Sequence, residues 1–515
     1  MEEKEYLVVM GIPSIKKYVF DTDRLKEIRG ASALLDDLNR NGIEKFLKDC
    51  ADLKEVDIIF SGGGSAQFIV KADQQKLKRC LRELESLFSE KTAGGLRLIW
   101  GAVEYDGSNY PEALRNAHLE SESQREENPF IPTSQLHTGY IRECDSCSKM
   151  ASHILPPNTD DQSQQLLCNE CHTKVKYNSE ARMGLWKELS DFLNQKHIRA
   201  QRPDNFEQIG DQCKVRKGYT ALIYADGNSM GKIIRQIKNQ DDFQFFSNTV
   251  EASLRDACFE SIEETFFKDM KNPTSILPAE ILLLGGDDLL VYLTAESAFS
   301  FAIKIAKKFN METAKIFSES PFFSEMLGGK GLTISLGIAY GKSHTPFSTL
   351  LDQAEELLHL AKKKGSQNAD PESYYVPAYI DYHLSTNFNQ ISVKESRNDH
   401  MELPGTDGSV IKLYQRPYSL EDAEALLEHA EGLKNSGIPG TRLNRLGNAP
   451  AMRKVDGTIE FLNLYTRAGD SRESIGKALA RFDCLTKMPW KEELFGDSTV
   501  LVDLIELAGF CNNNS

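Results

Sequence analysis

Two stretches of the chain carry the same order of apolar and polar segments. In the first stretch, residues 5–105, the apolar runs predict four strands, at 6–10, 56–60, 66–70 and 96–103. Helical patterns are expected at about 23–50 and 74–89, and the second helix repeats leucines at helical spacing. A glycine turn separates the second and third strands.

The second stretch, residues 219–365, repeats this order. Its apolar runs predict four strands, at 219–224, 281–284, 289–293 and 332–340. Helical patterns are expected at about 229–270, 295–309 and 348–364. The turn between its second and third strands again contains two glycines, Gly285 and Gly286.

Each stretch therefore predicts a β-α-β-β-α-β unit, the ferredoxin-like arrangement. We predict an α+β fold with two ferredoxin-like domains in tandem, although two unrelated α/β stretches would give a similar pattern. The predicted domains are 1–105, 106–215, 216–370 and 371–515.

The remaining regions differ in character. Residues 106–215 contain proline and polar clusters and four paired cysteines, and residues 367–403 are predicted to be a polar linker. A helix-rich region is expected from about 420 to 509, with Ser419 as an N-cap and Asp422 at the third helical position. The tail, 512–515, is expected to be disordered.

The four paired cysteines have the spacing of a structural zinc site. Cys144 and Cys147 are followed, after twenty residues, by Cys168 and Cys171. Four thiolates complete a tetrahedron, although the adjacent His172 could replace one of them. A redox role is the alternative, but two spaced pairs suit a metal better than a dithiol.

Candidate chemistry of another kind lies in the second repeat. Asp287 and Asp288 form the tip of its hairpin, and Asp226 ends the first strand, which is expected to be a neighbour. Carboxylates in this arrangement suit Mg²⁺ or Mn²⁺ and a nucleoside triphosphate. The alternative for the pair is an ordinary hairpin turn, in which Gly and Asp are common.

Phosphate binding is predicted nearby. The loop that continues through Gly227, Asn228, Ser229 and Met230 precedes a helix, whose first amide groups suit a triphosphate. Gly285 and Gly286 permit a turn and a close approach of substrate. Lys362 is expected to add positive charge, although Lys362 to Lys364 equally fit a solvated helix C-terminus that complements the helix dipole.

The first repeat provides an internal comparison. Its first strand ends at Gly11, and its hairpin tip runs from Gly62 to Ser65 without a carboxylate. We therefore expect the first repeat to be inert as a metal site and to act as a packing or nucleotide-contact partner.

Charge and hydropathy limit the class of protein. The formal net charge is −15, so the chain is not expected to bind nucleic acid unspecifically, although a local basic patch or partner subunits could hold RNA. We find no run of 18 apolar residues and no signal-peptide pattern, and we expect a cytoplasmic protein without membrane contact.

The sequence resembles the large, polymerase-like subunit of type III CRISPR effector complexes, the cyclic oligoadenylate synthase family. The resemblance rests on segment 224–232, the Gly285-Gly286-Asp287-Asp288 hairpin, residues 334–339 with the helix that follows, the four-cysteine insertion, and segments 11–20 and 25–32. It implies two palm domains, 1–105 degenerate and 216–370 catalytic, flanking a zinc-binding insertion.

The resemblance also implies an activity. ATP would be polymerised into a linear or cyclic oligoadenylate by two-metal catalysis, with release of pyrophosphate. Asp226, Asp287 and Asp288 would be the catalytic and metal-binding residues. Partner subunits with crRNA and target RNA are implied as well.

The chain departs from the family pattern in two respects. It contains no His-Asp dipeptide, so we expect a compact form without the HD-type nuclease. Asn228 stands where many members carry a second acid, which leaves metal stoichiometry open. Two other functions remain: the same site making a cyclic dinucleotide or nucleotide conjugate, and a non-catalytic scaffold of an RNA-guided complex.

Overall fold

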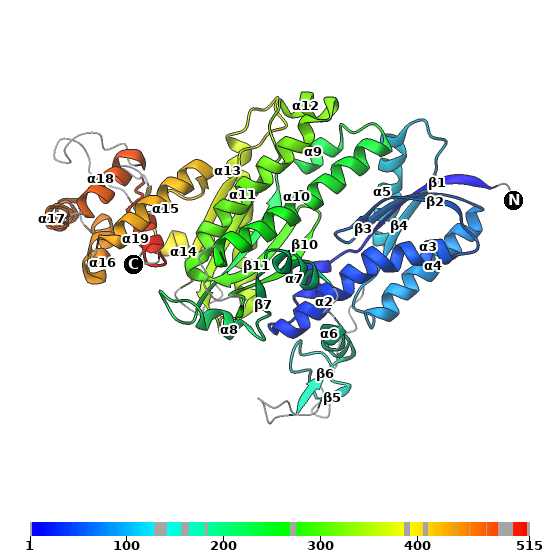
Figure 1. Ribbon diagram of the computed structural model, residues 1–515, viewed down its shortest axis with the longest axis horizontal. Coiled ribbons are helices and arrows are strands. Elements are labelled where there is room, and N and C mark those ends of the chain that lie inside the picture. The colour runs from blue at the N-terminus through cyan, green and yellow to red at the C-terminus, as the bar shows by residue number, and fades with distance from the viewer. Residues whose placement is uncertain are drawn as a thin grey trace.

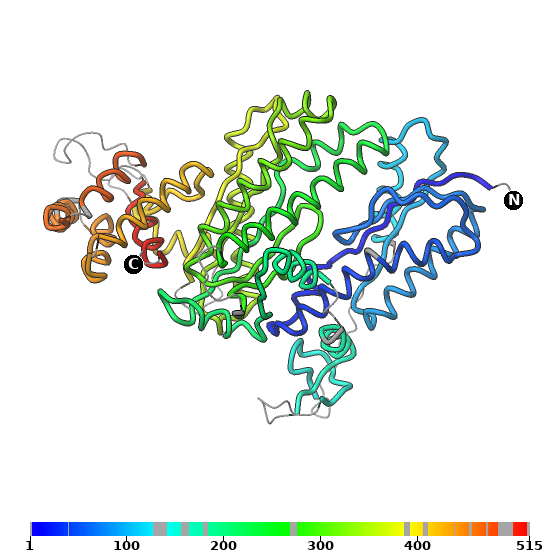
Figure 2. Tube along the Cα trace, in the orientation of Figure 1, coloured from blue at the N-terminus to red at the C-terminus, as the bar shows by residue number. Residues whose placement is uncertain are grey.

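The computed structural model describes residues 3–127, 142–155, 164–180, 184–267, 274–385, 392–404, 410–436, 438–452, 454–469, 471–482 and 498–511. Figure 1 shows an elongated molecule in which a second sheet and its helices lie between a first sheet and a group of C-terminal helices. The trace in Figure 2 places the N- and C-termini at opposite ends of the long axis. The prediction of disorder for 512–515 falls outside the described residues.

The first unit is a four-stranded antiparallel sheet with strand order β2-β3-β1-β4. Helices α2 and α4 cover one face and α5 packs on β1 and β4. Its elements are β1 (Lys4–Gly11), α1 (Ile15–Val19), α2 (Leu25–Asp37), α3 (Ile43–Asp49), β2 (Lys54–Gly62), β3 (Ser65–Ala72), α4 (Gln74–Lys91), β4 (Ile99–Glu104) and α5 (Tyr110–Glu127).

The connecting region holds short strands and helices. They are β5 (His153–Leu155), β6 (Gln165–Leu167), α6 (Asn169–Glu180), α7 (Leu185–Gln195), β7 (Arg199–Gln201) and α8 (Phe206–Asp211). Figure 1 shows β5, β6 and α6 projecting from the body of the molecule beside α2.

The second unit has strand order β10-β11-β8-β12, followed by β13 and β16. Its elements are β8 (Tyr219–Gly227), α9 (Met230–Ile234), α10 (Gln240–Phe266), β9 (Thr274–Ile276), β10 (Ala279–Gly285), β11 (Asp288–Thr294), α11 (Ala295–Ser318), α12 (Pro321–Leu327), β12 (Ile334–Lys342), α13 (Phe347–Gln367) and β13 (Tyr379–Leu384). The first four strands repeat the order of the first sheet, so the mixed α+β class is confirmed.

The two faces of the second sheet join different cores. Alternate residues of β8, such as Ile223, pack with α10 and α11. The intervening residues, such as Tyr224, share a core with α13 and with the first unit's helices. Both cores contain residues of the first unit, so they run across the predicted boundaries.

The predicted polar linker at 367–403 is wrong in part. Residues 379–384 form β13, which pairs in parallel with β12 from Leu336↔Ile380 onward. Burial explains this strand, because Ile380 and Tyr382 point into the core and Asp381 is neutralised by Arg397 of α14 (Val393–His400).

The C-terminal region is helical, as predicted. Ser419 caps its first helix by accepting a hydrogen bond from the Asp422 amide, as predicted. The region contains β14 (Glu402–Pro404), β15 (Val410–Lys412), β16 (Tyr418–Ser419), α15 (Leu420–Asn435), α16 (Gly440–Asn448), α17 (Lys454–Thr466), α18 (Ser471–Phe482) and α19 (Leu501–Ala508). No helix in the described residues is both long and apolar enough to cross a membrane.

Candidate active site

The end of β8 and the β10–β11 hairpin bring three aspartates to one edge of the second sheet. Leu289 of β11 pairs with Ala225 of β8, and the next residues along, Asp288 and Asp226, therefore lie side by side on the opposite face. Asp287 occupies the turn after Gly286, whose φ of 60° lies in the left-handed region that favours glycine.

Asp287 lies against Asp226. Burial, followed by the charges of Asp226 and Asp288, raises the pKa of Asp287 to about 7. The Asp287 and Asp226 carboxyl groups are close enough to share a hydrogen bond when Asp287 is protonated. The two carboxylates repel each other when both are ionised, and this repulsion is concentrated at one edge of the sheet.

Asp288 points to the same face as Tyr224. Burial and then the charge of Asp226 raise its pKa to about 6, while the charges of Lys16 and Lys362 oppose the increase. Lys16 belongs to the first unit, so both units set the electrostatics of this carboxylate.

Lys362 of α13 forms an ion pair with Asp226. Both side chains are about one third exposed, at 32% and 29%. Of the two interpretations of this lysine, the structure favours a place at the carboxylate site over a freely solvated helix end.

The three carboxylates do not form one compact ligand set. In the described part of the chain, the only group of three or more His, Cys, Asp or Glu whose ligand atoms all lie within 4.8 Å is the cysteine cluster. Their neighbours differ: Asp226 forms an ion pair with Lys362, whereas Asp288 lies beside Tyr224. Asp226 and Asp287 are the closer pair.

The loop after β8 presents its backbone rather than its side chains. Asn228 is buried, where it donates to Thr333 Oγ1 at 2.9 Å and accepts from Ser335 Oγ at 3.0 Å. Met230 is part of the core. Both side chains are buried, which differs from the predicted phosphate-binding role, and Asn228 instead links β8 to β12.

The predicted helix at 229–270 is broken. It consists of the five-residue α9 and, after a gap, α10, which Asn239 begins by accepting from the Asp242 amide. A strong N-cap at Asn239 restarts the helix in a new direction. The short α9 contributes little dipole to a phosphate site.

A cavity of about 370 Å³ lies between the two units, beside Asp288. Both hairpin tips line it, and Gly63 and Gly285 approach so closely that a Cβ on Gly285 would lie 3.5 Å from Gly63 Cα. Asp288, Lys16 and Asn39 also line it. Of the three aspartates, Asp288 lines the cavity, which thereby joins it to the first unit.

The sequence did not single out Lys16 or Asn39 as site residues. Lys16 Nζ lies 3.2 Å from Glu355 Oε1 and 4.4 Å from the Tyr224 ring centre. Asn39 Oδ1 is buried and has no hydrogen-bond partner in the described structure. No sequence pattern pointed to either residue. In the structure, Ser14 (φ 65°) and Ser229 (φ 61°) adopt the same left-handed conformation before α1 and α9, so the two units correspond here as well.

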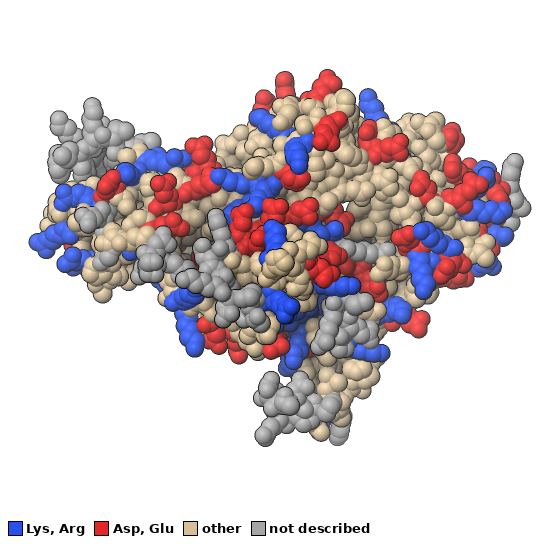
Figure 3. All heavy atoms as spheres, in the orientation of Figure 1, with Lys and Arg blue, Asp and Glu red and all other residues tan. Residues whose placement is uncertain are grey.

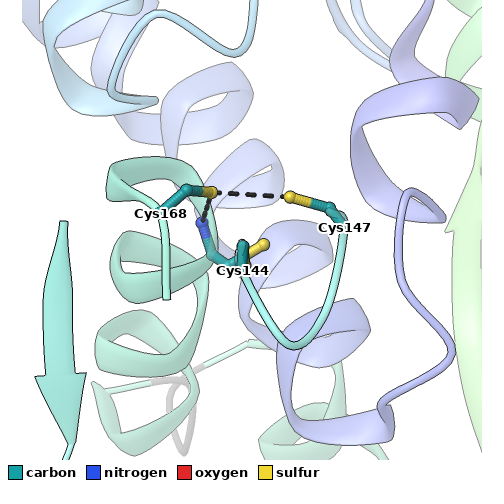
Figure 4. A group of neighbouring side chains, drawn as sticks. Cys144, Cys147 and Cys168 are labelled. Atoms are coloured by element: carbon teal, nitrogen blue, oxygen red, sulfur yellow. Dashed lines mark hydrogen bonds between the residues drawn. The ribbon is translucent and has the colours of Figure 1, made fainter. Parts of the chain in front are cut away.

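The four cysteines gather into a second candidate site. Their sulfur atoms all lie within 4.8 Å of one another, and Figure 4 shows those of Cys144, Cys147 and Cys168 turned toward one another. His172 is not needed as a ligand, since its ring stacks on His153 at 4.0 Å. The donor set and geometry fit a structural zinc ion.

This cysteine module is docked on α2. Ser146 donates to Glu27 at 2.6 Å, and Lys174, fully buried, donates to the Tyr18 carbonyl at 2.5 Å. Gly30 leaves room for the backbone of α6, because an added Cβ would lie 1.7 Å from the Lys174 carbonyl oxygen. The module thereby supports a helix that lines the cavity.

Comparison with protein families identifies both units. The model of the Cas10/Cmr2 second palm domain matches residues 219–369, and that of Csm1 subunit domain B matches residues 5–128. The chain is a Cas10/Csm1-like large subunit. No curated protein matches it in sequence.

Solved structures share the fold of this Cas10/Csm1-like chain. Csm1 of T. onnurineus is 14% identical, with a TM-score of 0.59, 99% of this chain covered and 70% of that one. The Csm1-Csm4 cassette in complex with cA4 is 13% identical, with a TM-score of 0.56 and coverage of 98% and 70%. At this identity the likeness supports the fold and not the activity.

Proposed function

We propose that this chain is a metal-dependent nucleotidyl cyclase, which joins ATP 3′→5′ into a linear or cyclic oligoadenylate in type III CRISPR defence. The supporting observation is the crowding of Asp226, Asp287 and Asp288 beside the cavity between the two hairpin tips. Partly buried like charges at such short range are unfavourable in isolation. They are suited to a bound cation and its triphosphate.

We propose specific roles for the residues. Asp226 and Asp287 would hold Mg²⁺ or Mn²⁺, with Asp288 completing the negative site. When bound, the cation would lower the pKa of the attacking 3′-hydroxyl and neutralise negative charge on the triphosphate. Lys362, released from Asp226, would balance phosphate charge. The glycine turn and the backbone of Gly227 to Ser229 would admit the phosphates closely.

The first unit would hold the acceptor nucleotide. Asn39 Oδ1 offers an unsatisfied acceptor to a base or ribose donor inside the cavity. Lys16 reaches from the first unit to the surroundings of Asp288. Each unit would thus contribute to one composite site, with only the second carrying carboxylates.

The wider assignments are also proposals. The two sheets are inferred to be copies of one ferredoxin-like unit, with domains at 1–105, 106–215, 216–370 and 371–515. Zinc would occupy the cysteine cluster. Subunits comparable to Csm4, with crRNA and target RNA, would be partners in the cytoplasm.

One experiment tests the activity. The purified chain, alone and with partner subunits and target RNA, is incubated with ATP and Mg²⁺ or Mn²⁺, and products are identified by mass spectrometry. Asp287→Ala with Asp288→Ala should abolish pyrophosphate release. Ser65→Ala, at the position of the first hairpin that corresponds to Asp288, should retain it. Full activity in the aspartate double variant would contradict the proposal.

Parallel incubations with the other nucleoside triphosphates address the product. Oligoadenylate from ATP alone supports the proposal, whereas a cyclic dinucleotide or a conjugate assigns the same site another product. No product under any condition, with nucleotide still bound, would favour the scaffold.

A further inference from the structure

A second groove lies where α13 meets the C-terminal region. Its volume is about 550 Å³, and its charged lining consists of Lys363, Lys364, Arg397, Lys412 and Arg416. Among the described residues, no carboxylate lines it. This contrasts with the net charge of −15 and with the face drawn in Figure 3, where charges of both signs are interspersed.

Helix α13 separates its three consecutive lysines between two sites. Successive residues of an α-helix are rotated by about 100°, so Lys363 and Lys364 share a face with Leu360 and Gln367, all of which line the groove. Lys362 points instead to Asp226. The helix dipole explains positive charge at this end of α13, but not its convergence with cations from α14 and β15.

The two lysines on the groove are available for a ligand. Lys363 and Lys364 are exposed, and in the described structure neither forms an ion pair. The third lysine, Lys412, lies 3.9 Å from Glu402, at the limit of such a contact. Two ammonium groups, those of Lys363 and Lys364, thus face the groove without an ion pair in the described structure, and Lys412 adds a third cation that Glu402 pairs weakly.

Two buried arginines form a fixed wall. Arg397 is held by Asp381 at 2.6 Å, and Arg416 by Asp503 at 2.7 Å. Arg397, 4% exposed, also lies 5.0 Å from the Tyr414 ring centre, yet its Nε has no hydrogen-bond partner in the described structure. A buried donor without an acceptor is unfavourable, so an acceptor is expected at this place.

We propose that this groove binds a phosphate-bearing ligand, either the backbone of a single-stranded RNA or a free polyphosphate. Guanidinium and ammonium groups together suit phosphate oxygens, and the volume exceeds that of one phosphate. The groove is distinct from the carboxylate site, and the proposal does not depend on the catalytic one.

Fluorescence anisotropy tests the proposal on the full chain. The probes are a labelled single-stranded RNA decamer and, as competitor, inorganic triphosphate, both in 50 mM salt. In Lys363→Glu with Lys364→Glu, binding should weaken about tenfold. The dependence of log K on log salt should become shallower by about 1.4, since each contact to a single strand contributes about 0.7.

The matched control is Arg82→Glu with Lys91→Glu, which reverses two exposed charges on α4. It should change binding less than twofold. Binding of RNA that triphosphate displaces poorly identifies the backbone as ligand, and tight binding of triphosphate identifies the free polyphosphate. Absence of binding by both probes, or an equal loss in both double variants, would overturn the proposal.

Discussion

Arg29 of α2 and Glu280 of β10 form an ion pair of 2.6 Å across the junction of the two units, with side chains only 6% and 2% exposed. Arg202 also pairs with Glu280, at 2.5 Å. Burial opposes ionisation of Glu280, but the charges of Arg202 and Arg29 hold its pKa below the usual value. The helix that lines the cavity is thereby fixed to the second sheet.

Replacement of Arg29 should loosen this junction. Arg29→Met leaves Glu280 buried with one partner, and loss of a partner from a buried pair typically costs about 3–5 kcal/mol. Because Arg202 remains, we expect the free energy of unfolding to fall by about 3 kcal/mol, measured by urea denaturation. Lys4→Met, which breaks an exposed pair with Glu104, should cost under about 1 kcal/mol. Equal losses of unfolding free energy in Arg29→Met and Lys4→Met would contradict a special role for the buried pair.

The shared strand order of the two sheets was predictable from sequence because period and turn chemistry are local. Gly62 pairs with Ser65 and Gly285 with Asp288, so the hairpins correspond as the glycines predicted. The N-cap at Ser419, in the C-terminal region, followed from the same kind of local rule.

Other parts of the fold and of the site could not be predicted, because they depend on contacts between residues far apart in the sequence. Strand β13 was hidden because Asp381 interrupts an apolar run, and only its pairing with Arg397 makes burial possible. The break at Asn239 was missed because helical propensity continues on both sides. Lys16 and Asn39 precede Asp226, the first of the three aspartates, by more than 180 residues. No sequence pattern links these two residues to the aspartates.

Gly227 should be indispensable to the carboxylate site. A Cβ there would lie 2.3 Å from Met230 Cε and 2.7 Å from Asp287 Oδ2. Gly227→Ala should therefore displace Asp287 and reduce nucleotidyl transfer at least about 100-fold, as small misplacements in active sites do. Gly231→Ala, four residues on, meets nothing within 4 Å. Its activity should match the wild type, in steady-state assays of pyrophosphate release.

Removal of zinc should destabilise structure beyond the cysteine cluster. We expect one zinc ion per chain by elemental analysis, lost in Cys171→Ser and kept in Cys213→Ser, a buried cysteine outside the cluster. Because Ser146 and Lys174 fasten the module to the first unit, hydrogen exchange should accelerate in α6 and in α2. Faster exchange in α6 alone would show that the module does not support α2.

His383 should make the protein sensitive to acid. It lies on β13, 8% exposed, where burial and the charges of Arg416 and Arg397 lower its pKa to about 3. The unfolded chain takes up a proton on this residue below about pH 6.5, whereas the folded chain does not until about pH 3. Its contribution to stability is therefore complete above pH 6.5 and is lost progressively as the pH falls toward 3.

The comparison of His383→Gln with the wild type isolates this effect. One pH unit corresponds to about 1.4 kcal/mol, so between pH 7.5 and 5.0 the wild type should lose about 2 kcal/mol more than the variant in urea denaturation. His400→Gln, on an exposed position of α14, should follow the wild-type profile. Parallel profiles for wild type and His383→Gln would mean that the imidazole is protonated in the fold, with its charge accommodated beside the two arginines.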